Sequence, residues 1–283
     1  MICYNCAGFH ILGGRGVPFT ERSKNTMSSS LPTLLVLTLV GFIAQLVDGS
    51  LGMGYGVFST TLLVAAGLMP AIASASVHTA EVVTTLVSGI SHHSLGNVDW
   101  KLALPLSISG IIGGVAGAVL LSNLPGSQIK PVVSAILILM GILVVWRFAV
   151  KYREDARAEA DPPAVAEVAG AKAEKILPTW KIVLVGLIAA AFDAFGGGGW
   201  GPITTPTLIL THNVQPHRVV GSVNASEFFV TLAIFITFLI SLGAEQFDWI
   251  VVACLLVGGV IAAPLAAWLC KKIPQRWLGI LIG

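Results

Sequence analysis

Four carboxylates and one histidine lie inside otherwise apolar segments of this chain: Asp48, Glu81, Asp193, Glu227 and His78. Ionisable side chains are costly in such segments and usually belong to a functional site. His78 and Glu81 are three residues apart, so they share one face of a helix. A carboxyl group shielded from water holds its proton more readily, and histidine titrates near neutral pH. The set therefore predicts proton handling, while capping of broken helix ends stays an open alternative for Asp48 and Asp193.

Two glycine-rich stretches surround the aspartates, at Phe42–Phe58 and Leu187–Ile203. They align with an offset of 145 residues, which matches Asp48 with Asp193. The same offset pairs Gly52 with Gly197, Gly54 with Gly199, Tyr55 with Trp200 and Gly56 with Gly201. Each glycine costs a helix about 1 kcal/mol relative to alanine. Because the pattern occurs twice in apolar surroundings, the sequence predicts two functional helix breaks.

Helix breaks of this kind can bind an anion. Irregular backbone at membrane depth is tolerated where it is buried in protein or lines a wet cavity, and free N–H groups at helix N-termini attract anions. The two stretches therefore predict facing anion cradles, with hydroxyl and amide side chains as further donors. The alternative is that the glycines only permit tight helix packing. The candidate substrate-binding residues are Gly52, Gly54, Tyr55, Gly56, Ser59, His78, Gly197, Gly199, Trp200, Gly201, Thr204 and Asn224.

The composition places these residues in a lipid bilayer. Mean hydropathy is +0.87, and 55% of residues are apolar against 11% charged, whereas soluble domains have about 25% charged residues. We therefore expect an all-α, multi-pass integral protein of the cytoplasmic membrane. The sequence has no basic stripe with interleaved aromatics, which argues against a nucleic-acid partner. Cys3 and Cys6 lack the further ligands that a zinc site needs, so we expect no metal and no cofactor.

The chain divides into a tail (1–30), a first transmembrane repeat (31–149), a charged cytoplasmic linker (150–179) and a second repeat (180–283). Each repeat is predicted to hold one broken or re-entrant helix and three further transmembrane helices. An offset of 146 pairs His78 with Asn224 and Glu81 with Glu227. The last apolar piece, Trp277–Gly283, is too short to span a bilayer, so the last helix is predicted to be truncated.

The orientation of the repeats depends on the breaks. If each broken segment is a full span, the repeats are parallel; if each is a re-entrant hairpin, they are inverted. Inversion places the basic cluster Lys271–Arg276 inside and the acidic loop Gly243–Asp248 outside, as the positive-inside rule prefers. We therefore favour inverted repeats, a common transporter plan. Four further histidines are predicted to lie in interfacial loops: His92, His93, His212 and His217.

These motifs resemble the TauE/SafE family of membrane permeases, often called sulfite exporters. The resemblance covers about residues 31–283 and rests on DGSLGMGYG followed by VHTAE, and on DAFGGGGWGPITTPTLIL followed by VGSVNASEFF. The first copy departs from the pattern, since Val57 stands where the second copy has Pro202. The resemblance implies export of small sulfur oxyanions or organosulfonates, such as sulfite.

The favoured function is thus a secondary transporter of small sulfur-containing anions, proton-linked through Asp48, Glu81, Asp193 and Glu227. A passive anion channel and a permease for another small anion stay open. An enzyme is disfavoured, because neither H-E-x-x-H nor G-x-S-x-G occurs. The expected partners are a small anionic substrate and the lipid bilayer, with a homodimer left open.

Overall fold

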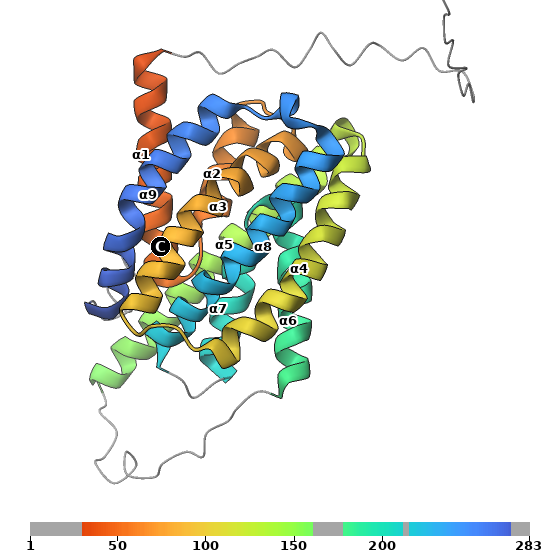
Figure 1. Cartoon of the computed structure of the whole chain (residues 1–283). Coiled ribbons are helices and arrows are strands. Elements are labelled where there is room, and N and C mark those ends of the chain that lie inside the picture. The colour runs from red at the N-terminus through yellow and green to blue at the C-terminus, as the bar shows by residue number, and fades with distance from the viewer. Residues whose placement is uncertain (1–29, 161–177, 212–214, 273–283) are drawn as a thin grey trace, which may run out of the picture.

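A computed structural model describes residues 30–160, 178–211 and 215–272. The predictions for the N-terminal tail, for most of the linker, for His212 and for the truncated last helix lie outside these residues. Within them every element is helical, which confirms the all-α prediction (Figure 1). The elements are α1 (Leu31–Leu51), α2 (Tyr55–Ala65), α3 (Pro70–Ser94), α4 (Trp100–Asn123), α5 (Gly126–Ala160), α6 (Thr179–Gly196), α7 (Trp200–Thr211), α8 (Pro216–Leu242), the 3₁₀ turn η1 (Ala244–Gln246) and α9 (Trp249–Lys272).

Five of these helices are long and apolar enough to cross a membrane: α1, α4, α6, α8 and α9. The central helix α3 is less apolar, because serine, threonine, histidine and glutamate side chains line its buried face. Large apolar residues are exposed on the outward faces of the bundle, where lipid can cover them. Examples are Leu35, Ile108, Ile138, Leu184, Ile240 and Ile261. The protein is therefore a multi-pass membrane protein.

Both predicted helix breaks are present. The helix before each break ends at a glycine in the left-handed conformation, Gly52 with φ 71° after α1 and Gly197 with φ 63° after α6. The N–H of Gly52 donates to the carbonyl of Asp48 at 2.6 Å, and the N–H of Gly197 donates to the carbonyl of Asp193 at 2.5 Å. Glycine adopts this conformation without the steric cost that other residues meet. The local sequence therefore ends each helix at matching positions.

The two halves interlock. The most extensive packing joins α1 to α9 and α6 to α4, while α3 and α8 pack together at the centre. Small residues make the close pairs possible, because a Cβ on Gly113 would overlap the carbonyl oxygen of Leu187 and a Cβ on Gly258 would overlap that of Thr38. The helix before each break therefore packs mainly against the other half of the protein. Helix α5 continues to Ala160, so its last turns include residues 150–160 of the predicted linker.

Two contacts bear on the orientation of the halves. Lys271 Nζ, at the end of α9, donates to the carbonyl of Leu95, after α3, at 2.8 Å. Arg218, near the start of α8, lies 3.8 Å from Asp99, before α4. Parallel repeats would put Leu95 and Lys271 on opposite sides of the membrane, whereas inverted repeats put them on the same side. In Figure 1, α1 begins at the upper end of the bundle and α6 at the lower end. These contacts favour inversion, which stays a prediction.

Candidate functional site

The two breaks touch each other in the interior of the bundle. A Cβ on Gly56 would overlap the carbonyl oxygen of Gly197, and a Cβ on Gly201 would overlap the backbone of Gly52 and Met53. The two contacts are equivalent, because Gly56 corresponds to Gly201 and Gly197 corresponds to Gly52 in the repeat. The glycines at positions 56 and 201 therefore allow backbone-to-backbone packing in this conformation. Their proposed contact with substrate would require the breaks to separate.

Threonines from the helices after the breaks reach across to the opposite half. Thr205 Oγ1 donates to the carbonyl of Gly52 at 2.6 Å. The equivalent hydroxyl, that of Thr60, lies against Gly197 and has no hydrogen-bond partner among the described residues. Of these two equivalent hydroxyls, that of Thr205 is hydrogen-bonded and that of Thr60 is not.

The paired aromatic residues after the breaks lie in the core. Tyr55 and Trp200 are almost completely buried. The Tyr55 hydroxyl donates to the carbonyl of Leu255 at 3.3 Å, and the Trp200 indole N–H donates to the carbonyl of Val223 at 3.3 Å. Each ring therefore anchors a broken segment to a neighbouring helix. Their proposed role in substrate binding has no direct support in this conformation.

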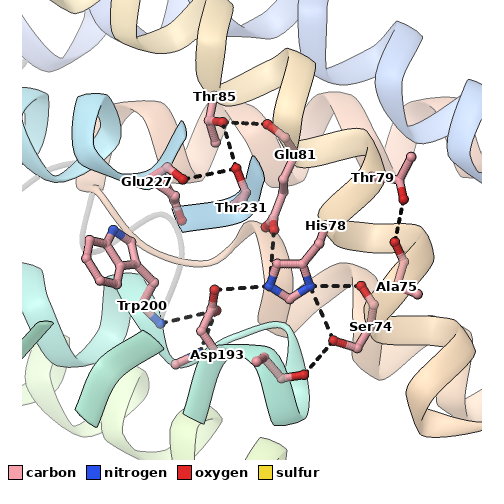
Figure 2. Close-up of polar contacts among 12 residues, drawn as sticks. Ser74, Ala75, His78, Thr79, Glu81, Thr85, Asp193, Trp200, Glu227 and Thr231 are labelled. Atoms are coloured by element: carbon pink, nitrogen blue, oxygen red, sulfur yellow. Dashed lines mark hydrogen bonds and ion pairs between the residues drawn. The ribbon is translucent and has the colours of Figure 1, made fainter. Parts of the chain in front are cut away.

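His78 occupies the centre of the polar contacts drawn in Figure 2. Its Nε2 lies 3.1 Å from Asp193 Oδ2 and 3.8 Å from Glu81 Oε2, and its Nδ1 lies 2.8 Å from the carbonyl of Ser74. Because a carbonyl only accepts, Nδ1 carries a hydrogen. The bond between Nε2 and Asp193 then needs one further proton, on either partner. The pair is thus imidazolium with carboxylate, or neutral imidazole with carboxylic acid.

The second oxygen of Asp193 serves the helix break. Oδ1 accepts from the backbone N–H groups of Gly199 and Trp200 at 3.0 and 3.2 Å, at the start of α7. A carboxylate at a helix N-terminus satisfies free N–H groups and complements the helix dipole. Asp193 therefore caps α7 and also bonds His78. The capping alternative describes these contacts, and proton handling by Asp193 stays a prediction. A substrate anion would have to displace this carboxylate to reach the same N–H groups.

The equivalent site in the other half has different chemistry. Asn224 stands where the first half has His78, and its Nδ2 donates to the carbonyls of Val220 and Asp48 at 3.2 and 3.4 Å. Its Oδ1 accepts from Ser88 at 2.8 Å. Asp48 Oδ2 is buried and has no hydrogen-bond partner among the described residues. The first half thus places an ionisable histidine beside a carboxyl group, and the equivalent position of the second half places a neutral amide beside Asp48, which has one unbonded oxygen.

Glu81 and Glu227 come from the central helices α3 and α8 and are both buried. Thr85 donates to the carbonyl of Glu81 at 2.5 Å, and Thr231 donates to that of Glu227 at 3.0 Å. Figure 2 shows both glutamates near the contact between these threonines. Among the described residues no lysine or arginine is buried. The fully buried side chains there that can carry positive charge are two histidines, His78 and His92. Of these, His78 is the one that contacts carboxyl groups, those of Asp193 and Glu81.

The sequence that forms these broken helices and buried acids is similar to known membrane proteins. Residues 37–283 match the family described as "Sulfite exporter TauE/SafE". The chain belongs to this TauE/SafE family. It is 46% identical over 250 residues to "Probable membrane transporter protein YtnM" of Bacillus subtilis (strain 168), which covers 88% of this chain and 79% of that protein. It is 31% identical over 148 residues to a "Probable membrane transporter protein" of Xylella fastidiosa (strain 9a5c), covering 50% of this chain and 54% of that protein. No solved structure was found to match.

Two further hydroxyls were expected at the site of this TauE/SafE protein. Thr204 Oγ1 donates to the carbonyl of Trp200 at 2.6 Å, within its own helix. Ser59, the equivalent residue in the first half, is buried without a hydrogen-bond partner among the described residues. Ser59 is thus the better placed of the two to donate to a ligand.

Gln45 was not predicted to belong to the site. It is a fully buried residue of α1, and its amide nitrogen and oxygen both lack partners among the described residues. Its equivalent in the second half is Ala190, so the repeat pattern gave no indication of it. The sequence feature that could have indicated Gln45 is its position as a lone amide side chain within a long apolar segment.

The prediction that His92 lies in an interfacial loop is wrong. Helix α3 extends to Ser94, so His92 is on its inward face and fully buried. Its Nε2 lies 2.8 Å from the carbonyl of Gly49, and its Nδ1 lies 3.2 Å from Asn97 Nδ2. In the TauE/SafE fold seen here, His92 ties the end of α3 to the end of α1.

Proposed function

We propose that this protein exports small sulfur-containing anions, such as sulfite or organosulfonates, across the cytoplasmic membrane in a proton-linked manner. The family match and the names of the relatives support membrane transport. The observation that carries the proton linkage is the bond from His78 to Asp193, near the end of α6, with Glu81 3.8 Å from His78. Buried ionisable groups at the meeting of broken helices are typical of transporter sites.

The charges of the site give the linkage a physical cause. Four carboxyl groups are buried, those of Asp48, Glu81, Asp193 and Glu227, and the side chain of His78 contacts two of them. Like charges repel strongly where water is excluded. An anion therefore enters more readily when these carboxyl groups are protonated. The four acids and His78 then form the proton-coupling set.

The donors for the anion are neutral. With no buried lysine or arginine among the described residues, the donors left are backbone N–H groups and the unbonded hydroxyls of Ser59 and Thr60. Asn224 would add its amide only by releasing the carbonyls of Val220 and Asp48. Neutral donors hold an anion less tightly than a guanidinium does, which suits a site that must release its substrate. Export of a net anion is also favoured by an inside-negative potential, by about 2.3 kcal/mol per charge per 100 mV.

Transport would follow from movement of the interlocked halves around the breaks. Helices α1 and α6 each pack mainly on the other half, so a tilt of one half moves both breaks together. Separation of Gly56 from Gly197 and of Gly201 from Gly52 would expose backbone N–H groups now in contact. Alternating access by such rocking is common among inverted-repeat transporters.

The purified full chain in proteoliposomes tests this proposal. Vesicles loaded with sulfite, thiosulfate, sulfoacetate or sulfate are compared with protein-free vesicles, with and without a pH gradient. We expect saturable flux of at least one sulfur anion and a change in rate when a protonophore removes the gradient. No protein-dependent flux of any of these anions would overturn the proposal. Flux that does not saturate and ignores the gradient would instead indicate a passive channel.

A further inference from the structure

Gln45 is a buried amide that lacks hydrogen-bond partners among the described residues. Its side chain is fully buried, and neither Nε2 nor Oε1 is bonded. An unsatisfied buried polar group costs about 1–3 kcal/mol. A residue with two such atoms in an otherwise apolar helix therefore indicates that the working protein supplies a partner for it.

The neighbours of Gln45 form a small polar site. Gln45 Nε2 and Ser88 Oγ lie 3.4 and 3.5 Å from the position that a Cβ on Gly49 would occupy. Asp48, with its unpaired Oδ2, is three residues further along α1 and shares that face of the helix. Asn224 is held beside them by its bonds to Ser88 and to the carbonyl of Asp48. We call Gln45, Asp48, Ser88 and Asn224 the α1 polar site.

The free hydrogen-bonding groups of this site require a ligand that both donates and accepts. The Gln45 amide offers two N–H donors and one acceptor oxygen, whichever protonation state Asp48 has. Ser88 already donates its hydrogen to Asn224. A fully deprotonated oxyanion only accepts, so it would leave the acceptor oxygen of Gln45 unmatched. An oxyanion with one acidic O–H satisfies both kinds of group.

The charges around the site agree with this choice. Asp193 on α6 and Glu227 on α8 interact electrostatically with Asp48, as does Glu81 on α3. His92 of α3 is bonded to the carbonyl of Gly49. Helix α9 contributes the methyl group of Ala266. His78 is already engaged by Asp193 and Glu81. A doubly charged anion would therefore meet the repulsion of these acids without a cation of its own, whereas a singly charged one meets about half of that repulsion.

We infer that the α1 polar site binds a monoprotonated oxyanion of the hydrogen sulfite type, so that the substrate carries its own proton. Its S–O oxygens accept from the Gln45 amide, and its O–H donates to Asp48 or to Gln45 Oε1. No bond to sulfur is made or broken, and the proton stays on the substrate. This inference rests on the proposed function and narrows it to sulfur anions with an acidic proton.

The test compares Gln45→Met, which keeps the length of the side chain and removes its hydrogen bonds, with Gln246→Met in η1 as the matched control. Sulfite flux into proteoliposomes is measured at several pH values, with sulfate and methanesulfonate as competitors that lack an acidic proton near neutral pH. We expect wild-type flux to follow the concentration of hydrogen sulfite and to resist both competitors. We expect Gln45→Met to raise KM about tenfold, the effect of losing about 1.4 kcal/mol, and Gln246→Met to behave as wild type.

Binding is measured separately as the shift in melting temperature that sulfite produces in detergent-solubilised protein. A shift that Gln45→Met abolishes supports the inference even if no flux is found, in which case the proposed function alone fails. Flux that follows total sulfite at every pH, or an unchanged KM in Gln45→Met, overturns the inference and leaves the proposed function standing. Should Gln45→Met fold poorly, Gln45→Ala replaces it, since Ala190 fills the equivalent position of the second half.

Discussion

The hydroxyl oxygens of Thr85 and Thr231 lie 3.4 Å apart, where α3 and α8 pack together. The two residues are 146 positions apart, the offset that also pairs His78 with Asn224. A contact between a residue and its own counterpart is what a twofold relation between the halves requires. On one side of this contact His78 bonds Asp193, and on the other Asn224 accompanies Asp48. The helices on the two sides of this contact are equivalent, but the polar residues His78 and Asn224 at equivalent positions differ.

The substitution His78→Asn makes the two sides alike. We expect gradient-driven flux to fall about 10- to 100-fold, because a hydrogen bond involving a charged group contributes about 1.5–3 kcal/mol. Flux is measured in proteoliposomes with and without a pH gradient. His93→Asn, at an exposed position on the same helix, is the control and should match wild type. A full response to the gradient in His78→Asn would exclude His78 from the coupling.

Neutralising the central glutamates should remove the coupling while leaving the fold intact. In Glu81→Gln and Glu227→Gln the buried side chain keeps its size and loses only the ability to titrate. We expect flux that no longer responds to pH, with a melting temperature close to that of wild type. Glu245→Gln, in the exposed loop before α9, controls for a general effect of charge. If both buried variants keep the pH dependence of wild type, the glutamates have a structural role only.

The helix breaks were predictable because their cause is local. Asp48 and Asp193 are followed at the same distance by Gly52 and Gly197, and a glycine with positive φ ends a helix regardless of the rest of the fold. The apolar segments likewise predicted the spans, because lipid exposure requires them. The duplication predicted that the two breaks face each other as anion cradles, whereas their direct backbone contact was not predicted.

The contacts of the site were less predictable because they join different halves. The repeat offset pairs His78 with its counterpart Asn224, yet the contact partner of His78 is Asp193, 115 residues away. Gln45 was missed because its counterpart is an alanine, and a search for repeated residues cannot find it. His92 was predicted to lie in a loop because the residues after Ile90 are polar, whereas α3 extends to Ser94.

Packing between the breaks should make Gly56 sensitive to the smallest substitution. In Gly56→Ala the new methyl group overlaps the carbonyl of Gly197, and overpacking of this kind costs about 1–3 kcal/mol. We expect a lower melting temperature and reduced flux. Gly141→Ala, in α5, is the matched control, because nothing lies within 4 Å of its Cβ position. An equally small effect of both substitutions would mean that the breaks are not in contact in the membrane.

The threonine pair across the breaks allows a comparison of bonded and unbonded hydroxyls. Thr205→Val removes the hydrogen bond to the carbonyl of Gly52 and should destabilise the protein by about 0.5–1.5 kcal/mol. Thr60→Val removes a buried hydroxyl without a partner among the described residues and should not lower the melting temperature. If Thr60 donates to substrate, its valine variant should instead raise KM. Equal losses of stability in the two variants would contradict the asymmetry seen here.

The contact between Lys271 and Leu95 predicts the membrane orientation of two loops. It places the end of α3 with the basic end of α9, which the positive-inside rule assigns to the cytoplasm. The loop before α9 then lies outside. We therefore expect Glu245→Cys, in a chain whose native cysteines are replaced, to react with a membrane-impermeant maleimide on intact cells. Ser94→Cys should react only after permeabilisation, and permeabilised cells should label both. Parallel repeats would place both positions inside, so protection of both cysteines in intact cells would exclude the inverted arrangement.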